Sequence, residues 1–131
     1  MPALLMAGLV IVFLVRSNNM RINTDFATSV SLKYHYIDKT IDLVITNNND
    51  IRALKEILAG RTYKDNPSCG FSLDISITFT DGHKNITFCP ARDGCPNIRI
   101  NESNRYIRIT NEQRKLLDNI LRKYGIVFPC V

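Results

Sequence analysis

The chain has 131 residues, of which 45% are apolar and 22% are charged, and its formal net charge is +5. This length suits a single domain with a modest core, and this composition excludes an intrinsically disordered chain. The 17 Lys and Arg residues are scattered without a basic run, so nucleic-acid binding is not favoured as a function.

The N-terminus carries an uncharged apolar stretch from Met1 to Val15, which ends at Arg16. Such a stretch is typical of the apolar core of a signal peptide, and it is shorter than the span of about 20 residues that a transmembrane helix needs. It has no polar face at the period of a strand or of a helix, which disfavours a buried core element. We therefore predict a signal peptide or membrane anchor over residues 1–17.

The charges around this stretch bear on its orientation. No Lys or Arg precedes it, whereas Arg16 and Arg21 follow it. Because positive charge tends to stay on the cytoplasmic side of a membrane, this placement favours a cytoplasmic location for the rest of the chain. We predict an exported or membrane-anchored protein, and a cytoplasmic-facing orientation is the alternative.

For the rest of the chain, the sequence predicts a polar linker over residues 18–28 and one domain over residues 29–131. Alternation of apolar and polar side chains predicts a strand over Ser29–Ile37. A second strand is predicted over Ile41–Thr46, with a turn at residues 38–40 between the two.

A short amphipathic helix is predicted over Asp50–Ala59. Asn48 or Asn49 can cap its first turn, and the carboxylate of Asp50 suits the positive end of the helix dipole. Gly60 is expected to end the helix. The apolar stripe of this helix consists of Ile51, Leu54, Ile57 and Leu58.

The segment from Ile75 to Phe88 predicts a β-hairpin that turns at Asp81-Gly82. A two-residue loop would place Ile77 opposite Ile86, and a four-residue loop would place Ile77 opposite Phe88. Both registers keep the apolar side chains on one face, so the sequence leaves the two open.

A second hairpin is predicted from Asn97–Ile100 and Tyr106–Ile109, and a second helix follows it. Thr110 and Gln113 have the spacing of a capping box, and Gly125 is expected to end the helix. Together these elements predict an α+β fold, in which an antiparallel sheet of hairpins carries both amphipathic helices on one face.

The four cysteines are Cys69, Cys89, Cys95 and Cys130. Their spacing fits neither the close pairs of a structural zinc site nor the C-x-x-C pair of a thioredoxin-like protein. An even count behind an export segment favours disulfides. The two-residue register of the first hairpin would bring Cys69 beside Cys95, so we predict the bridges Cys69–Cys95 and Cys89–Cys130. Four buried thiols in a cytosolic protein are the alternative.

The sequence contains no recognisable catalytic, cofactor-binding or metal-binding motif. We predict a small exported or membrane-anchored domain that is not an enzyme, and that binds a protein or peptide partner or serves the cell envelope. The alternative is a small thiol-dependent enzyme or redox protein that uses Cys89 or Cys95.

Overall fold

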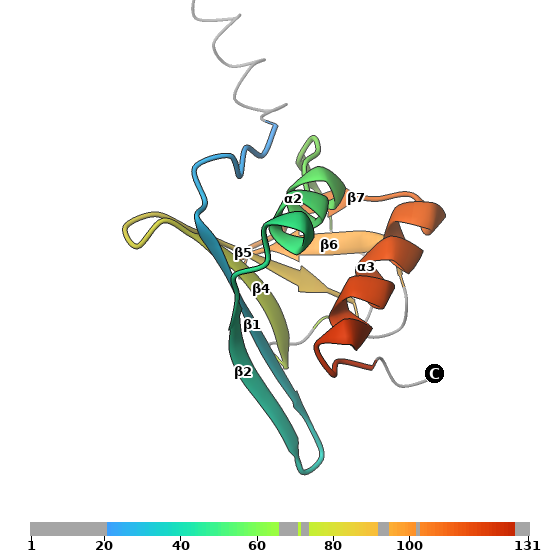
Figure 1. Cartoon of the computed structure of the whole chain (residues 1–131). Helices are drawn as coiled ribbons and strands as arrows, with labels where there is room; N and C mark the ends of the chain where they lie inside the picture. Colours follow the sequence, from blue (N-terminus) through green and yellow to red (C-terminus); the bar gives the residue numbers. More distant parts are fainter. Residues whose placement is uncertain (1–20, 66–70, 72–73, 92–94, 102, 128–131) are drawn as a thin grey trace, which may run out of the picture.

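The structure is a computed structural model that describes residues 21–65, 71, 74–91, 95–101 and 103–127 (Figure 1). The predicted signal peptide or membrane anchor, residues 1–17, lies outside the described residues. The described part of the predicted linker packs against the domain, because Thr24 and Ala27 are buried and the Ile22 amide donates to the Gly60 carbonyl at 2.9 Å.

Seven strands form one sheet in the order β2-β1-β4-β5-β6-β7-β3, and every neighbouring pair is antiparallel. The α+β prediction is thereby confirmed for the described residues. The strands are β1 (Ser29–Tyr36), β2 (Lys39–Ile45), β3 (Tyr63–Lys64), β4 (Ile75–Thr80), β5 (Asn85–Pro90), β6 (Asn97–Ile100) and β7 (Arg105–Arg108). The helices are α2 (Asn48–Ile57) and α3 (Asn111–Lys123).

One face of the sheet is apolar and packs against both helices (Figure 1). A row of directly opposite, buried residues crosses β1, β4, β5 and β6 on this face and consists of Leu32, Ile77, Phe88 and Ile100. Leu54 of α2 and Leu117 of α3 are fully buried in the same cluster. Each such side chain contributes about 1.5 to 3 kcal/mol through its removal from water.

The hairpin formed by β4 and β5 has the four-residue loop, over residues 81–84. Ile77 lies opposite Phe88, and the Asp81 carboxylate accepts the backbone N–H groups of His83 and Lys84 at 2.8 and 2.7 Å. Gly82 has a φ of 94°, which only glycine adopts readily. The two-residue register, on which the predicted cysteine pairing rested, is not formed.

The ends of the first helix differ from the prediction. Asn47 is the N-cap in place of Asn48 or Asn49, and its side-chain oxygen accepts the Asp50 amide at 3.1 Å. At the other end, Leu58 rather than Gly60 follows the last turn. The Leu58 amide still donates to the Leu54 carbonyl at 3.0 Å, and the Leu58 side chain is fully buried in the core.

The second helix begins and ends as predicted. Thr110 is its N-cap, and a capping box with Gln113 is formed in both directions at 3.1 and 2.9 Å. Gly125 lies just beyond the helix with a φ of 91°, so a side chain there would strain the backbone.

A polar contact joins the two helices above the core. The Asp50 carboxylate of α2 accepts the Lys123 ammonium group at 2.9 Å and also accepts the Tyr124 hydroxyl. These hydrogen bonds, first from Tyr124 and then from Lys123, lower the pKa of the Asp50 carboxyl below its ordinary value of 3.8. Burial, together with the bond to Asp50, raises the pKa of Tyr124 to about 12.

Replacing Asp50 with Asn tests this contact. The amide keeps the shape of the carboxyl group but loses its charge, so we expect the free energy of unfolding at neutral pH to fall by about 1 to 3 kcal/mol. Because the folded-state pKa of Asp50 is lowered, the carboxylate stabilises the fold above the ordinary value of 3.8, and this stability is lost as the pH falls through the lowered value. Asp50→Asn should therefore lose less stability in acid than the native chain.

The free energy of unfolding at alkaline pH provides a second test of this contact. The raised pKa of Tyr124 stabilises the fold fully below the ordinary value of 10.0 and ceases to do so as the pH rises towards about 12. Urea unfolding at acidic, neutral and alkaline pH measures both effects. The control is Glu56→Gln, which removes an exposed carboxylate from α2. Identical pH profiles for Asp50→Asn and the native chain would contradict the assignment.

Candidate interaction surfaces

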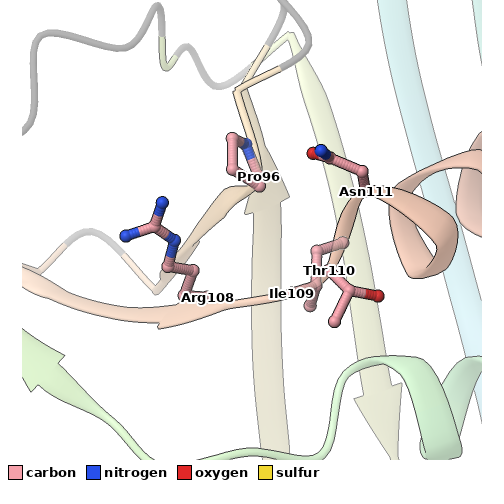
Figure 2. Close-up of a pocket in the computed structure, with 5 residues that line it drawn as sticks. All are labelled: Pro96, Arg108, Ile109, Thr110 and Asn111. Atoms are coloured by element: carbon pink, nitrogen blue, oxygen red, sulfur yellow. The ribbon is translucent and has the colours of Figure 1, made fainter.

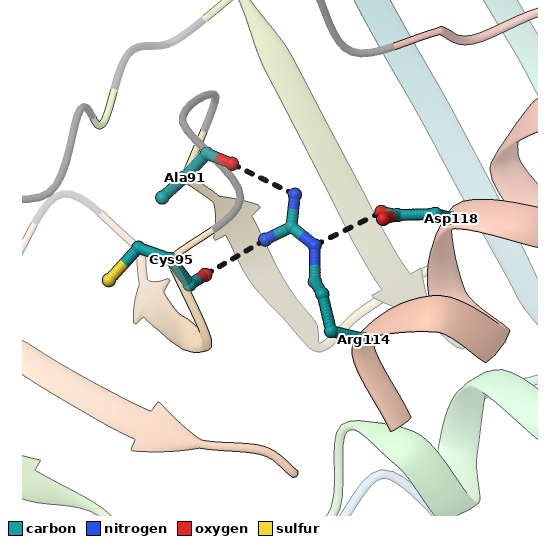
Figure 3. Close-up of polar contacts among 4 residues, drawn as sticks. All are labelled: Ala91, Cys95, Arg114 and Asp118. Carbon is teal, nitrogen blue, oxygen red and sulfur yellow. Dashed lines mark hydrogen bonds and ion pairs between the residues drawn. The ribbon is translucent and has the colours of Figure 1, made fainter. Parts of the chain in front are cut away.

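The loop between Cys89 and Cys95 is held at its described ends by Arg114 of α3 (Figure 3). One terminal guanidinium nitrogen donates to the Ala91 carbonyl at 2.9 Å, and the other donates to the Cys95 carbonyl at 3.0 Å. The Nε atom donates to Asp118, one turn further along α3, at 3.0 Å. Arg114 is 5% exposed, so three directed hydrogen bonds compensate its buried charge. This contact fastens Ala91 and Cys95 to α3.

Replacing Arg114 with Lys tests this fastening. An ammonium group cannot reproduce the planar fork that reaches two carbonyl groups and a carboxylate at once, so buried acceptors would be left unpaired. We expect a loss of about 2 to 4 kcal/mol in the free energy of unfolding, measured by urea denaturation. Arg122→Lys, an exposed change on the same helix, should stay within about 0.5 kcal/mol of the native chain. Equal stability of the two variants would refute the role of Arg114.

Cys89 lies on the face of the sheet without helices and is nevertheless fully buried. It is directly opposite Arg99 of β6, which in turn is opposite Tyr106 of β7. The Phe71 ring lies 5.2 Å from the Tyr106 ring and 5.7 Å from the Arg99 guanidinium carbon. Among the described residues, the buried Arg99 Nε atom has no hydrogen-bond partner, and the contact with the Phe71 ring is a favourable interaction of this guanidinium group.

Of the four cysteines, the structure describes Cys89 and Cys95. Cys89 is a buried thiol and does not form the predicted bridge to Cys130. Its side chain is enclosed at the sheet, where Cys89 lies opposite Arg99. Cys95 is disulfide-bonded, and its sulfur also accepts an N–H from Asn97 at 3.3 Å. Cys69 and Cys130 lie outside the described residues, so the bridge between Cys69 and Cys95 stays a prediction.

Alkylation separates a structural Cys89 from a reactive one. A catalytic thiol must be reachable and readily deprotonated, whereas the Cys89 side chain has no exposed surface. We expect iodoacetamide to leave Cys89 unmodified in the native chain and to modify it, without reductant, once the chain is unfolded. Peptide mass mapping reads this directly. Rapid modification of Cys89 in the native state would favour the thiol-enzyme alternative.

A cavity of about 390 Å³ lies where β6 and β7 meet the start of α3 (Figure 2). Its lining consists of Pro96, Arg108, Ile109, Thr110 and Asn111. The Thr110 hydroxyl is already occupied by the capping box, and the described residues of the lining include no His, Cys, Asp or Glu. Across the residues that the structure describes, no three His, Cys, Asp or Glu side chains are grouped for a metal ion.

The β1–β2 hairpin extends beyond the helices (Figure 1). All seven residues of β2 pair with β1, and no other described strand pairs with β2, so its outer side is an open edge. At the tip, Ile37 is 75% exposed and has a φ of 56°, which is rare for a β-branched residue. Val44 of β2 is 56% exposed. The turn lies at Ile37-Asp38, earlier than the predicted residues 38–40.

The backbone direction along this hairpin follows from one hydrogen bond. The His35 amide donates to Asp74, beside β4, at 2.7 Å. Because backbone groups alternate in direction along an antiparallel strand, the neighbouring residues of β1 direct theirs towards β2. In the observed register, Tyr34 lies opposite Ile41 and Leu32 opposite Leu43. The backbone groups of the alternate residues of β2 therefore point outwards, and these residues are Thr40, Asp42 and Val44.

A second cavity, of about 240 Å³, adjoins this edge. It is lined by Lys33, Tyr34, His35, Thr40, Ile41, Asp42 and Asp74. His35 Nδ1 and the Thr40 hydroxyl are 3.0 Å apart, which joins β1 and β2 at this point. Two residues with outward-facing backbone groups, Thr40 and Asp42, thus also line a cavity.

No family model, curated protein or solved structure matches this chain. Within the described ranges, neither helix has the length and apolar character needed to span a bilayer. The function is therefore inferred from the geometry of the chain alone.

Proposed function

We propose that this protein is a non-enzymatic binding domain that takes up an extended segment of a partner protein as an additional strand along β2. The open outer edge of β2 carries the proposal, because it presents regular rows of backbone donors and acceptors. Strand addition uses such an edge, with main-chain hydrogen bonds supplying affinity and alternate side chains supplying specificity.

The edge has few of the features that prevent strand pairing. Proteins usually protect an edge with proline, a bulge, a very short strand or an outward lysine. β2 has seven residues, no proline and an uninterrupted register with β1. Its lysine, Lys39, donates to the Gly125 carbonyl at 2.6 Å and is thus held at the C-terminal end of the domain. Asp42 is the charged side chain that remains along the outward-facing row.

A different protein suits this edge better than a second copy. If two copies paired antiparallel with all seven residues of β2 overlapping, the central residue, Asp42, would lie directly opposite itself. Like charges in directly opposite positions destabilise a sheet. The occupant proposed here is therefore an extended segment of another protein.

The proposal includes the location expected from the sequence, which is exported or membrane-anchored. The apolar stretch from Met1 to Val15 supports it. The full burial of Cys89 supports a structural role for this thiol over a nucleophilic one. Fractionation of cells that express a tagged full-length chain tests the location, and recovery of the chain in the cytosolic fraction would contradict it.

Amide hydrogen exchange and a proline substitution test the binding mode. The probe is a phage-displayed library of linear eight-residue peptides, selected on the full-length chain. A selected peptide should slow exchange at the amides of Asp42 and Val44 at least tenfold, whereas the amide of Leu43 is already protected by β1. Val44→Pro removes one outward N–H group and should abolish binding, whereas Val44→Thr keeps that group and should bind.

Exchange protection needs no variant, so it remains informative if Val44→Pro fails to fold. Peptides that bind Val44→Pro as tightly as the native chain would refute strand addition. Protection confined to the helices, or a library that gives no binder at all, would do the same.

A further inference from the structure

We infer that the segment taken up by β2 is an amphipathic strand with apolar residues on the helix side and a Lys or Arg opposite Asp42. This inference rests on the proposed function and specifies the chemistry of the partner. It follows from the two faces of β2, which differ in burial and charge.

On the helix side, β2 presents apolar side chains that the domain covers only in part. Ile41 and Leu43 pack against the core but remain partly exposed. The chain after α3 runs beside them, because the Tyr34 hydroxyl donates to the Val127 carbonyl at 2.9 Å and a Cβ on Gly125 would lie 3.2 Å from Ile41. The Val127 side chain is 53% exposed. Apolar residues of an incoming strand would lie opposite Ile41 and Leu43 and complete their burial.

On the other face, Thr40, Asp42 and Val44 form the row that an incoming strand would meet. Directly opposite side chains lie on the same face of a sheet, so a residue opposite Asp42 also lies beside the cavity of about 240 Å³ that Asp42 lines. A carboxylate at this position attracts a cation and repels another carboxylate. Val44, which is 56% exposed, suits an apolar or β-branched neighbour.

Lys33 does not remove this preference. It lies opposite Asp42 on β1, yet neither residue forms an ion pair with any described side chain. A cation on the incoming strand would lie about two strand spacings from Lys33, which is roughly 9 to 10 Å. At physiological ionic strength this separation exceeds the screening length of about 8 Å. The attraction across one strand spacing therefore outweighs the repulsion across two.

Charge reversal on both sides of the interface provides the test. From one peptide that binds through the β2 edge, analogues are made with Lys or Glu at the position opposite Asp42, as located by exchange protection. The Lys analogue should bind the native chain about five to ten times more tightly than the Glu analogue. Asp42→Lys should reverse that order, and 0.5 M NaCl should weaken both preferences. Glu56→Lys, a charge reversal on α2, is the control and should change neither.

The outcomes separate this inference from the proposed function. Peptides that require the Val44 amide but bind equally well with Lys or Glu would overturn the inference and leave strand addition standing. Binding that is indifferent to Val44→Pro would overturn both. An analogue with serine at the helix-side positions should lose at least tenfold in affinity, and unchanged affinity would contradict the apolar half of the inference.

Discussion

The sheet has one apolar face, and two helices must cover it. Helix α2 carries the chain from β2 at one edge to β3 at the other, and α3 fills the remaining space beside it. The β1–β2 hairpin extends past this layer (Figure 1). The side chains of Ile41 and Leu43 on β2 remain partly exposed. The geometry that gives the domain its core thus also leaves an open edge with an incompletely covered apolar border.

Two buried charges position the helices over the sheet. Asp50 joins α2 to the end of α3, and Arg114 joins the start of α3 to the carbonyl groups of Ala91 and Cys95. Each charge is compensated by several directed hydrogen bonds, so removing one partner costs more than the net value of the contact. Helix α3 is therefore fixed at both ends, and these contacts hold the two helices in place over the sheet. The β1–β2 hairpin extends beyond the two helices (Figure 1).

Local patterns predicted most of the fold. Period-two alternation located β1, and the capping box at Thr110 and Gln113 located the start of α3, because both signals lie within a few residues of sequence. The loop at Asp81 stayed ambiguous, since both registers keep the same side chains on the apolar face. The two-residue strand β3 is too short to carry a period. The prediction placed the cap of α2 at Asn48 or Asn49, whereas the cap is Asn47, the first of three successive asparagines.

The outer edge of β2 could not be predicted as the candidate site from the sequence, for a different reason. Strand order decides which strand lies at the edge, and only the crossing of α2 over the sheet places β2 there. The role of Arg114 was equally hidden, because two of its three partners are backbone carbonyl groups that any residue type provides. Cys89 lies opposite Arg99, and Arg99 lies opposite Tyr106, because β5, β6 and β7 pair in this order, which the sequence alone does not show.

Intermolecular contacts between α-protons provide a direct test of strand addition at β2. In an antiparallel pair, residues that do not exchange hydrogen bonds have their Cα atoms about 4.5 Å apart, which gives a strong nuclear Overhauser effect between α-protons. For a bound peptide, we expect such effects from Ile41 and Leu43 of β2 to the added strand, and weaker ones from Asp42. Intermolecular effects confined to α3 or to the cavity at Arg108 would contradict strand addition at β2.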